Sequence, residues 1–275
     1  MTIKQALKNN PNISLKDKEI FLEEILQKER SWLFSHEQYN LTEKELDQFE
    51  SFISRREKFE PVNYIIAKTN FYNKSFVTDL RALIPRPETE QLVEIILAQK
   101  KKIPKNPKII EIGTGTGAIS ITLFHELKKL SPQIIATDIS QNALDLASIN
   151  ANNLKAKIQF IQNDLLKHID DKFDLIIANL PYIPHHFLKK LSPDIKYFEP
   201  EIALDGGNDG TELIRKLLDQ AKNNIKQNSL IYLEIWHDQG ESLVQYIKNI
   251  FPKSKINVIK DLSGQDRFIE IEVAG

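Results

Sequence analysis

The chain has 275 residues, of which 41% are hydrophobic and 27% charged, and its formal net charge at pH 7 is −1. This length accommodates one large domain, or a core domain beside a small one. A near-neutral charge argues against a protein whose main partner is a long nucleic acid. The sequence has no cysteine, which is typical of a reducing compartment, and no apolar run near the roughly 20 residues that span a bilayer. We therefore expect a cytoplasmic protein with no membrane association.

The first part of the chain has helical patterns. Ser14 precedes apolar residues at helical spacing that begin with Phe21. Thr42 and Glu45 are spaced as a capping box before a second apolar helical face. Residues 1–75 carry 12 basic and 12 acidic side chains, so this segment has no electrostatic preference for phosphate. The pattern predicts a small helical bundle over residues 1–75.

Apolar runs alternate with helical patterns through residues 76–275, after a short hairpin that we predict near residues 70–78. The alternation predicts an α/β fold with a doubly wound, mostly parallel sheet. Ligands of such sheets bind at the carboxyl ends of the strands. Strands are expected at residues 108–112, 134–137, 158–161, 175–178, 230–235 and 268–273, with helices over 144–151 and 213–225 among those between them.

A glycine-rich segment, Gly113-Thr114-Gly115-Thr116-Gly117, follows the first of the parallel strands. Glycine lets the backbone turn sharply and approach a ligand closely. The spacing is Gly-x-Gly-x-Gly, whereas dinucleotide-binding folds have Gly-x-Gly-x-x-Gly. The position between a strand and a helix favours a site for a nucleoside-type cofactor over a simple turn.

Acidic residues follow the next two strands. Asp138 ends the second strand, where an ionised carboxylate can accept hydrogen bonds from two ribose hydroxyls. The same residue type also caps helices, but the glycine-rich segment favours the ribose role. Asn163 and Asp164 can accept from an adenine amino group, and a loop-capping role fits them about equally well.

The tetrapeptide Asn179-Leu180-Pro181-Tyr182 follows the strand at 175–178. An amide or adenine nitrogen is a poor nucleophile because its lone pair is delocalised, and its two N–H groups need two acceptors. The Asn179 side-chain oxygen and a backbone carbonyl, that of Leu180, can supply both and aim the lone pair at a sulfonium methyl group. Tyr182 can pack on the planar face of the substrate. An ordinary turn is the alternative for any Asn-x-Pro sequence, but three other sites at strand ends favour methyl transfer to a planar nitrogen.

These segments resemble the HemK/PrmC family of protein-(glutamine-N5) methyltransferases, which act on peptide chain release factors. The resemblance extends over nearly the whole chain. It departs from the family pattern at Leu180, where a proline is usual, at Ala67, where glycine is usual, and at Trp236-His237, where a smaller residue is more common. Further matching segments are Glu60–Tyr64, Leu83–Glu90, Glu199–Gly210 and Asp261–Arg267.

The resemblance implies a substrate-recognising helical bundle over residues 1–75 and a seven-stranded class I methyltransferase domain over residues 76–275. It implies S-adenosyl-L-methionine as the methyl donor and the glutamine of a Gly-Gly-Gln tripeptide in release factors as the acceptor. The residues it assigns to the cofactor are Gly113, Thr114, Gly115, Thr116, Gly117, Asp138, Asp164, Leu165 and Asn179. Those it assigns to catalysis and the substrate are Asn179, Leu180, Pro181 and Tyr182, with Arg86 and Glu88 beside the substrate.

Other functions fit parts of the pattern. A glutamine methyltransferase of a ribosomal protein and an adenine-N6 methyltransferase face the same nitrogen chemistry, although the neutral N-terminal segment argues against nucleic acid as the substrate. The glycine spacing argues against a dinucleotide-dependent oxidoreductase, and a non-catalytic cofactor-sensing protein is a further alternative. His185-His186 and the pair Glu234 and His237 invite a metal hypothesis, but neither provides a full ligand set, and we expect no metal.

Overall fold

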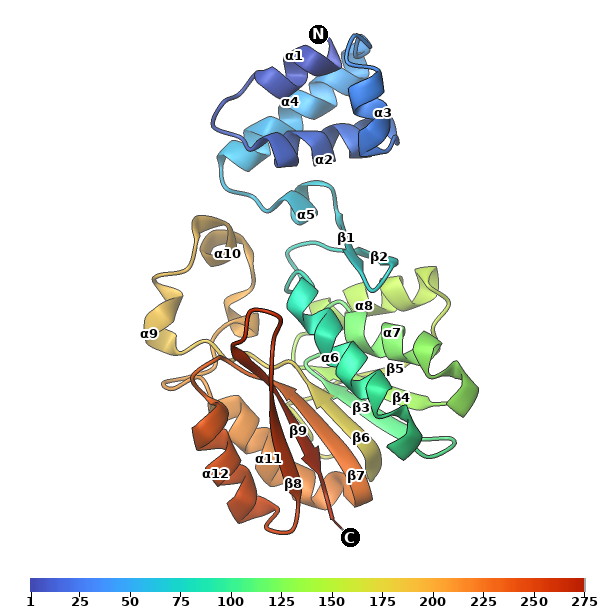
Figure 1. Cartoon of the computed structure of the whole chain (residues 1–275), viewed down its shortest axis with the longest axis vertical. Helices are drawn as coiled ribbons and strands as arrows, with labels where there is room; N and C mark the ends of the chain where they lie inside the picture. The colour runs from blue at the N-terminus through green and yellow to red at the C-terminus, as the bar shows by residue number, and fades with distance from the viewer. Residues whose placement is uncertain (275) are drawn as a thin grey trace. The chain divides into compact units, whose positions relative to one another are not determined.

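The computed structural model describes residues 1–274 and contains two compact units, each with its own hydrophobic core (Figure 1). The first unit contains residues 1–68 and 192–198, and the second contains residues 69–191 and the chain from residue 199 onward. No helix within residues 1–274 combines the length and the apolar character needed to cross a membrane. The helices of the first unit are α1 (Ile3–Lys8), α2 (Leu15–Leu26), α3 (Arg30–Ser35), α4 (Glu43–Glu57), α5 (Val62–Ile65) and α10 (Pro193–Phe198).

The predicted helix starts in the first unit are confirmed. The Ser14 hydroxyl accepts a hydrogen bond from the Asp17 amide at 3.0 Å and so caps α2. At the start of α4, the Glu45 amide donates to the Thr42 hydroxyl at 3.3 Å, and the Thr42 amide donates to the Glu45 carboxylate at 2.8 Å. Each bond satisfies a backbone or side-chain group that the first helical turn leaves without a partner.

The core of the first unit is built from the apolar faces of these helices. Phe21 of α2 and Phe52 of α4 meet edge to face, with ring centroids 5.4 Å apart. Near the end of this unit, Ala67 has a φ of 56°, in the left-handed region that favours glycine. This conformation would favour glycine over alanine at this position.

The second unit has a seven-stranded sheet in the order β5-β4-β3-β6-β7-β9-β8, in which β9 alone runs against its neighbours. This topology confirms the predicted mostly parallel α/β fold. The strands are β3 (Lys108–Ile112), β4 (Gln133–Asp138), β5 (Gln159–Gln162), β6 (Phe173–Ala178), β7 (Ile225–Glu234), β8 (Lys255–Lys260) and β9 (Asp266–Glu272). The predicted hairpin forms a separate two-stranded sheet of β1 (Lys68–Phe71) and β2 (Lys74–Val77).

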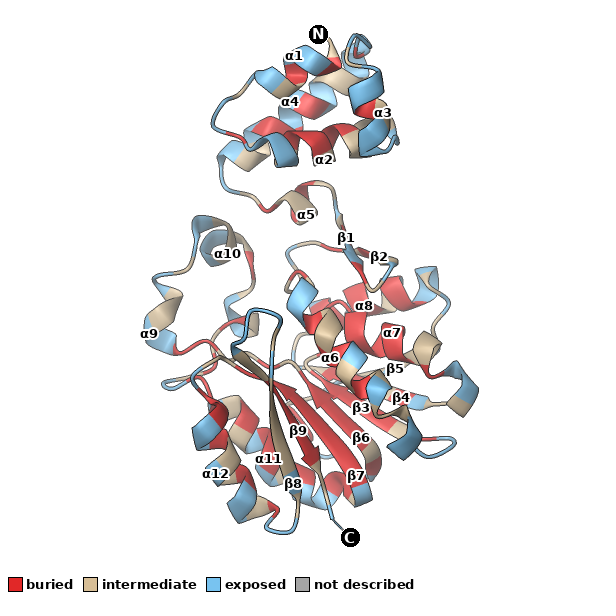
Figure 2. Cartoon of the chain, viewed as in Figure 1, coloured by how far each residue is buried: buried red, intermediate tan, exposed pale blue. Residues whose placement is uncertain are grey.

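Helices cover both faces of this sheet (Figure 1). Side chains alternate along each strand, so that in β7 Ile231 and Leu233 face one core while Leu230 and Tyr232 face the other. The central strands are therefore buried on both sides (Figure 2). One face is covered by α6 (Pro87–Ala98), α7 (Ala118–Glu126) and α8 (Gln141–Asn153), and the other by α11 (Glu212–Asn224) and α12 (Gly240–Ile250).

Two local predictions are wrong. Ile225, predicted as the last residue of a helix, instead begins β7, where it pairs with Phe173 and is 8% exposed. Strand β8 was not predicted, because most of its residues are only half-buried and the apolar pattern is weak. Neither difference changes where the strands end. The chain crosses from β5 back to β6 on the other side of β3, so the carboxyl ends of β4, β3 and β6 border the switch point at which ligands bind in such sheets.

Candidate active site

A cavity of about 500 Å³ lies at the carboxyl ends of the central strands in the second unit. Residues from the ends of β3, β4 and β6 line it, together with the segment before α6 and the loop that follows residue 199. All of these residues belong to the same compact unit. The lining residues from the strand ends include Gly113, Thr114, Gly115, Thr116, Asp138, Asn163, Asp164, Leu165, Asn179, Leu180 and Pro181.

The glycine-rich loop connects β3 to α7 along the cavity wall. Gly113 has a φ of 72°, and a Cβ atom there would lie 3.1 Å from Cδ2 of Leu180. Gly117 has a φ of 82° and immediately precedes α7, and its Cβ would lie 2.9 Å from Cδ1 of Ile121. A side chain at either position would strain the backbone and push on a packed neighbour. The loop therefore keeps its backbone close to the cavity only with glycine at these positions.

Two acidic side chains hold this loop. The Gly115 amide donates to Oδ2 of Asp138 at 2.9 Å, and the Ser140 amide donates to Oδ1 at the same distance. Burial raises the pKa of Asp138, and these backbone hydrogen bonds oppose the rise. Beneath the loop, buried Glu111 accepts from the Thr114 hydroxyl at 2.6 Å, and burial raises its pKa to about 7. Both carboxylates therefore fix the loop, and both line the cavity, Glu111 from within β3 and Asp138 from the end of β4.

The segment after β5 forms another part of the wall. Asp164 pairs with Lys216 at 2.7 Å and is 38% exposed, while Leu165 is buried with a φ of 56°. A left-handed conformation is unusual for leucine and persists only where the surroundings impose it. The Asn163 amide group donates to the Leu165 carbonyl at 2.9 Å, which holds this turn. The segment places an apolar side chain and a carboxylate at the cavity together.

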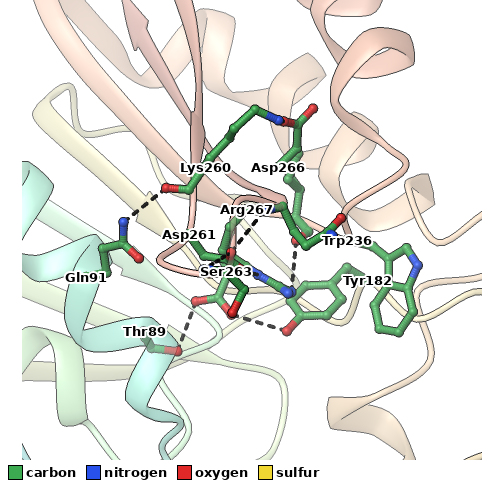
Figure 3. Close-up of polar contacts among 12 residues, drawn as sticks. Thr89, Gln91, Tyr182, Trp236, Lys260, Asp261, Ser263, Asp266 and Arg267 are labelled. Carbon is green, nitrogen blue, oxygen red and sulfur yellow. Dashed lines mark hydrogen bonds and ion pairs between the residues drawn. The ribbon is translucent and has the colours of Figure 1, made fainter.

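Asn179 is joined to a buried carboxylate through one hydroxyl group. Nδ2 of Asn179 donates to Oγ1 of Thr89 at 3.2 Å, and the Thr89 hydroxyl donates to Oε2 of Glu234 at 2.9 Å. The Tyr182 hydroxyl donates to the other oxygen, Oε1 of Glu234, at 3.2 Å. Figure 3 labels Thr89 and Tyr182, the two residues that donate to this carboxylate. Thr89 lies in the first turn of α6, and Glu234 is the last residue of β7.

Burial dominates the electrostatics of this group. Glu234 is 1% exposed, and this burial raises its pKa to about 7, although the hydrogen bonds from Thr89 and Tyr182 and the charge of Arg267 oppose the rise. Burial also raises the pKa of Tyr182, and the charge of Glu234 adds to that effect, so Tyr182 remains a neutral hydrogen-bond donor. The site thus contains a carboxyl group that changes its charge near neutral pH.

The structure places most of the predicted site residues at the cavity, with three exceptions. Tyr182 does not line the cavity, and its ring centroid lies 6.1 Å from that of Trp236. Gly117 lies at the start of α7, and Glu88 is exposed on α6. Arg86 does line the cavity, and its guanidinium group contacts both carboxylate oxygens of buried Glu199 at 2.6 Å.

Sequence reasoning missed Thr89 and Glu234 as functional residues. They are 145 positions apart, and Thr89 is 90 positions from Asn179, so no local spacing joins them. Two signals were available: Thr89 lies in the segment Leu83–Glu90 that resembles the family, and Glu234 lies at the carboxyl end of a parallel strand.

Comparison with known proteins gives matches along most of the chain. Residues 2–66 match the PrmC N-terminal domain, and residues 89–192 match the methyltransferase small domain. The release factor glutamine methyltransferase of Lactococcus lactis is 38% identical over 84% of this chain and 84% of its own length. That of Bacillus cereus is 34% identical over 93% of this chain and 91% of its own length, and that of Clostridium acetobutylicum is 33% identical over 98% of each.

Solved structures of methyltransferases have a fold similar to that of this chain. A methyltransferase from Pyrococcus furiosus aligns with a TM-score of 0.55 at 19% identity, covering 81% of this chain and 98% of that one. Trm5b from Pyrococcus abyssi aligns with a TM-score of 0.52 at 16% identity, covering 76% of this chain and 56% of that one. At these identities the likeness concerns the fold alone.

Proposed function

Because the chain belongs to the S-adenosylmethionine-dependent release factor glutamine methyltransferase family, we propose that it methylates the side-chain amide nitrogen of the glutamine in the Gly-Gly-Gln tripeptide of peptide chain release factors. The observation that carries this proposal is the cavity that Asn179 shares with the glycine-rich loop and Asp138. An amide acceptor after β6 and a cofactor-type loop after β3 thereby border one space. Such an arrangement suits the transfer of a group between a nucleoside-type cofactor and a planar nitrogen.

The residues at the cavity fit the cofactor. Gly113 and Leu180 both line the cavity, and a Cβ atom at Gly113 would lie 3.1 Å from Cδ2 of Leu180. The absence of a side chain at Gly113 therefore leaves space beside the loop backbone that a ligand can use. In our proposal, the loop from Gly113 to Gly117 holds the methionine and ribose portions, and Asp138 accepts from the ribose hydroxyls. Asp164 and Leu165 flank the adenine. When bound, S-adenosylmethionine supplies a methyl group attached to a positively charged sulfur.

The remaining residues act on the glutamine amide. Oδ1 of Asn179 and the carbonyl of Leu180 accept its two N–H groups, which orients the nitrogen lone pair and stabilises the positive charge that develops on nitrogen. The carbonyl belongs to the backbone, so leucine serves as well as the usual proline, and its side chain packs in the core at 5% exposure. Pro181 limits the conformation of the turn. Arg86 lines the cavity on the substrate side. We assign Tyr182 a supporting role through its hydrogen bond to Glu234, and Glu88 a contact with the substrate outside the cavity, from the exposed side of α6.

We assign substrate recognition to residues 1–75 and methyl transfer to residues 76–275. The match of residues 2–66 to the PrmC N-terminal domain supports the first assignment. Equal numbers of acidic and basic side chains in residues 1–75 favour a protein partner over nucleic acid. Release factors act in the cytoplasm, and we place this enzyme there as well.

Substitution of Asp138 by alanine is expected to weaken S-adenosylmethionine binding by about 100-fold. Hydrogen bonds to a charged acceptor contribute about 1.5–3 kcal/mol each, and the substitution also releases the Gly115 amide. Isothermal titration calorimetry measures the affinity. Asp145→Ala is the control, because this exposed aspartate on α8 does not line the cavity. Equal affinity of the Asp138→Ala variant and the wild type would remove Asp138 from the cofactor site.

The substrate assignment is tested with S-adenosylmethionine that carries a radioactive methyl group. The purified chain is incubated with a release factor, with ribosomal proteins or with duplex DNA. We expect label in the release factor alone. Label in DNA with none in the release factor would instead support the adenine-N6 alternative, and label in a ribosomal protein would move the substrate within the same chemistry.

A further inference from the structure

Two hydrogen bonds join Asn179 to Glu234 through the Thr89 hydroxyl, and we call them the relay. The ionisation state of Glu234 decides which atom donates in each of them. An ionised carboxylate only accepts hydrogen bonds, and a hydroxyl group has one proton to donate. When Glu234 is ionised, the Thr89 hydroxyl must use that proton for Oε2 of Glu234, at 2.9 Å. Its oxygen can then only accept from its other neighbour, Asn179, whose Nδ2 lies 3.2 Å away.

The direction of the hydrogen bonds in the relay decides which end of the Asn179 side chain reaches the substrate. With Nδ2 bound to Thr89, the other end of the planar amide, Oδ1, is turned away from Thr89 and remains available as an acceptor. A rotation of 180° would exchange these atoms and present an N–H donor to the N–H groups of a glutamine amide. That orientation cannot bind the substrate in the way the proposed function requires.

We infer that Glu234, acting through Thr89, is a positioning residue that keeps the Asn179 amide in the orientation with Oδ1 facing the substrate nitrogen. The inference rests on the proposed function and extends it, because Glu234 does not line the cavity and has no contact with the substrate in this scheme. Tyr182 acts on the same carboxylate, since its hydroxyl donates to Oε1. Two donors from different elements thus hold the ionised form of one buried group.

Protonation of Glu234 would release this constraint. A protonated carboxyl can donate to the Thr89 oxygen, and the Thr89 proton is then free to point at Oδ1 of Asn179, which permits the rotated amide. The charged groups that act on Glu234 are Arg267 of β9, which favours the ionised form, and Glu88 of α6, which opposes it. Arg267 is itself paired with Asp261 at 3.2 Å (Figure 3).

The pH dependence of turnover follows from the raised pKa of Glu234, about 7. The ionised form is the productive one, so kcat should rise with pH and level off above neutrality. The glutamine amide does not titrate in this range. Glu111 has a similarly raised pKa but lies beneath the cofactor loop, so its titration should alter the KM for S-adenosylmethionine rather than kcat.

The central test is the pH profile of Glu234→Gln. Glutamine keeps the size of the side chain but adds a donor and cannot ionise. We expect kcat to fall 10- to 100-fold and the affinity for S-adenosylmethionine to change less than about threefold. The rise of kcat with pH near pH 7, which is the ascending limb of the pH profile, should disappear. The main loss should be in kcat rather than in KM for the release factor, because the Asn179 hydrogen bond strengthens as charge develops on nitrogen. A limb that persists in Glu234→Gln would overturn the inference.

The matched control is Glu270→Gln. Glu270 is also a buried glutamate of the sheet, 3% exposed, and it accepts from the Tyr232 hydroxyl at 2.8 Å and from Asn257 at 2.7 Å. It does not line the cavity. The control variant should keep the kcat and the pH limb of the wild type. A loss of the limb in both variants would mean that it reports general stability and would also overturn the inference.

Thr89 provides a second, independent test. Thr89→Ser keeps the hydroxyl group and should retain kcat within about threefold, whereas Thr89→Val removes it and should match the loss in Glu234→Gln. The double variant Thr89→Val/Glu234→Gln should be no slower than either single variant, because each substitution already interrupts the relay. Fully additive losses would contradict the relay. Thr122→Val, at a buried threonine of α7 outside the cavity, controls for the change of shape.

A measurement without turnover separates this inference from the proposed function. The side-chain NH2 signal of Asn179, assigned by its loss in Asn179→Ala, should shift with a midpoint near pH 7 in NMR spectra of the cofactor-free protein. The shift should be absent in Glu234→Gln. A signal that does not respond to pH would refute the relay even if the release factor is methylated. Conversely, a titrating signal in a protein that does not label a release factor would leave the relay intact and refute the proposed substrate.

Discussion

Replacing Asn179 by alanine is expected to lower kcat by about 10³-fold while leaving the affinity for S-adenosylmethionine within about threefold of the wild type. The substitution removes the oxygen that accepts a substrate N–H and stabilises the charge on nitrogen, and the loss of one such preorganised group costs about 10²–10³ in kcat. The relay to Glu234 also loses its purpose in this variant. Single-turnover kinetics with a release factor and calorimetry with the cofactor measure the two effects separately.

Asn224→Ala is the matched control for this variant. Asn224 is a buried asparagine at the end of α11, where its side chain donates to the Asp171 carbonyl at 3.1 Å and does not line the cavity. Its removal should lower the melting temperature without a comparable effect on kcat. If Asn179→Ala turns over like the wild type, the role that we give to this side chain is wrong.

Gly210→Ala is expected to reduce kcat by at least about 100-fold and to destabilise the protein by about 3 kcal/mol, as overpacking of a closed site does. Gly210 has a φ of 76°, and a Cβ atom there would overlap the carbonyl oxygen of Tyr182 and lie 2.5 Å from Nε2 of Gln239. That nitrogen donates to the Tyr182 carbonyl at 2.9 Å and so holds the end of the catalytic turn. The new methyl group would break this contact and displace the turn that begins at Asn179.

Gly264→Ala separates the clash from the backbone strain. Gly264 has a φ of 82°, close to that of Gly210, but a Cβ there would have no neighbour within 4 Å among the described residues. Its cost should be limited to about 1 kcal/mol for a left-handed alanine, with kcat unchanged. Thermal unfolding and steady-state kinetics of the two variants provide the comparison. Equal effects of both substitutions on kcat would show that the packing against Tyr182 is unimportant.

The sequence was most informative where chemistry depends on a position after a strand. The fold class and the family resemblance are confirmed, and Gly113, Asp138 and Asn179 lie at one cavity because parallel strands bring their carboxyl ends to one edge. Hydrogen bonds between residues close in sequence were also predictable, as in the capping box of Thr42 and Glu45, because the spacing within one segment determines them.

Contacts between distant segments were not predictable in this way. The hydrogen bonds from Asn179 through Thr89 to Glu234 join the turn after β6 to α6 and the end of β7. The motifs that contain Asn179 and Thr89 give no indication that these side chains meet. The hydrogen bond from the Tyr182 hydroxyl to Glu234 was not predicted either, because it depends on where β7 ends. Side-chain networks of this kind follow from tertiary packing, which no spacing rule within one segment describes.

The most direct test of the central claim is the position of the transferred methyl group. A release factor incubated with the enzyme and S-adenosylmethionine is digested and analysed by tandem mass spectrometry. We predict one additional methyl group, a net gain of one CH₂ in mass, on the side-chain amide of the glutamine in Gly-Gly-Gln. With Asn179→Ala the same modification should form about 10³-fold more slowly. An unmodified glutamine, or a methyl group on another residue, would contradict the assignment of this cavity to a glutamine amide.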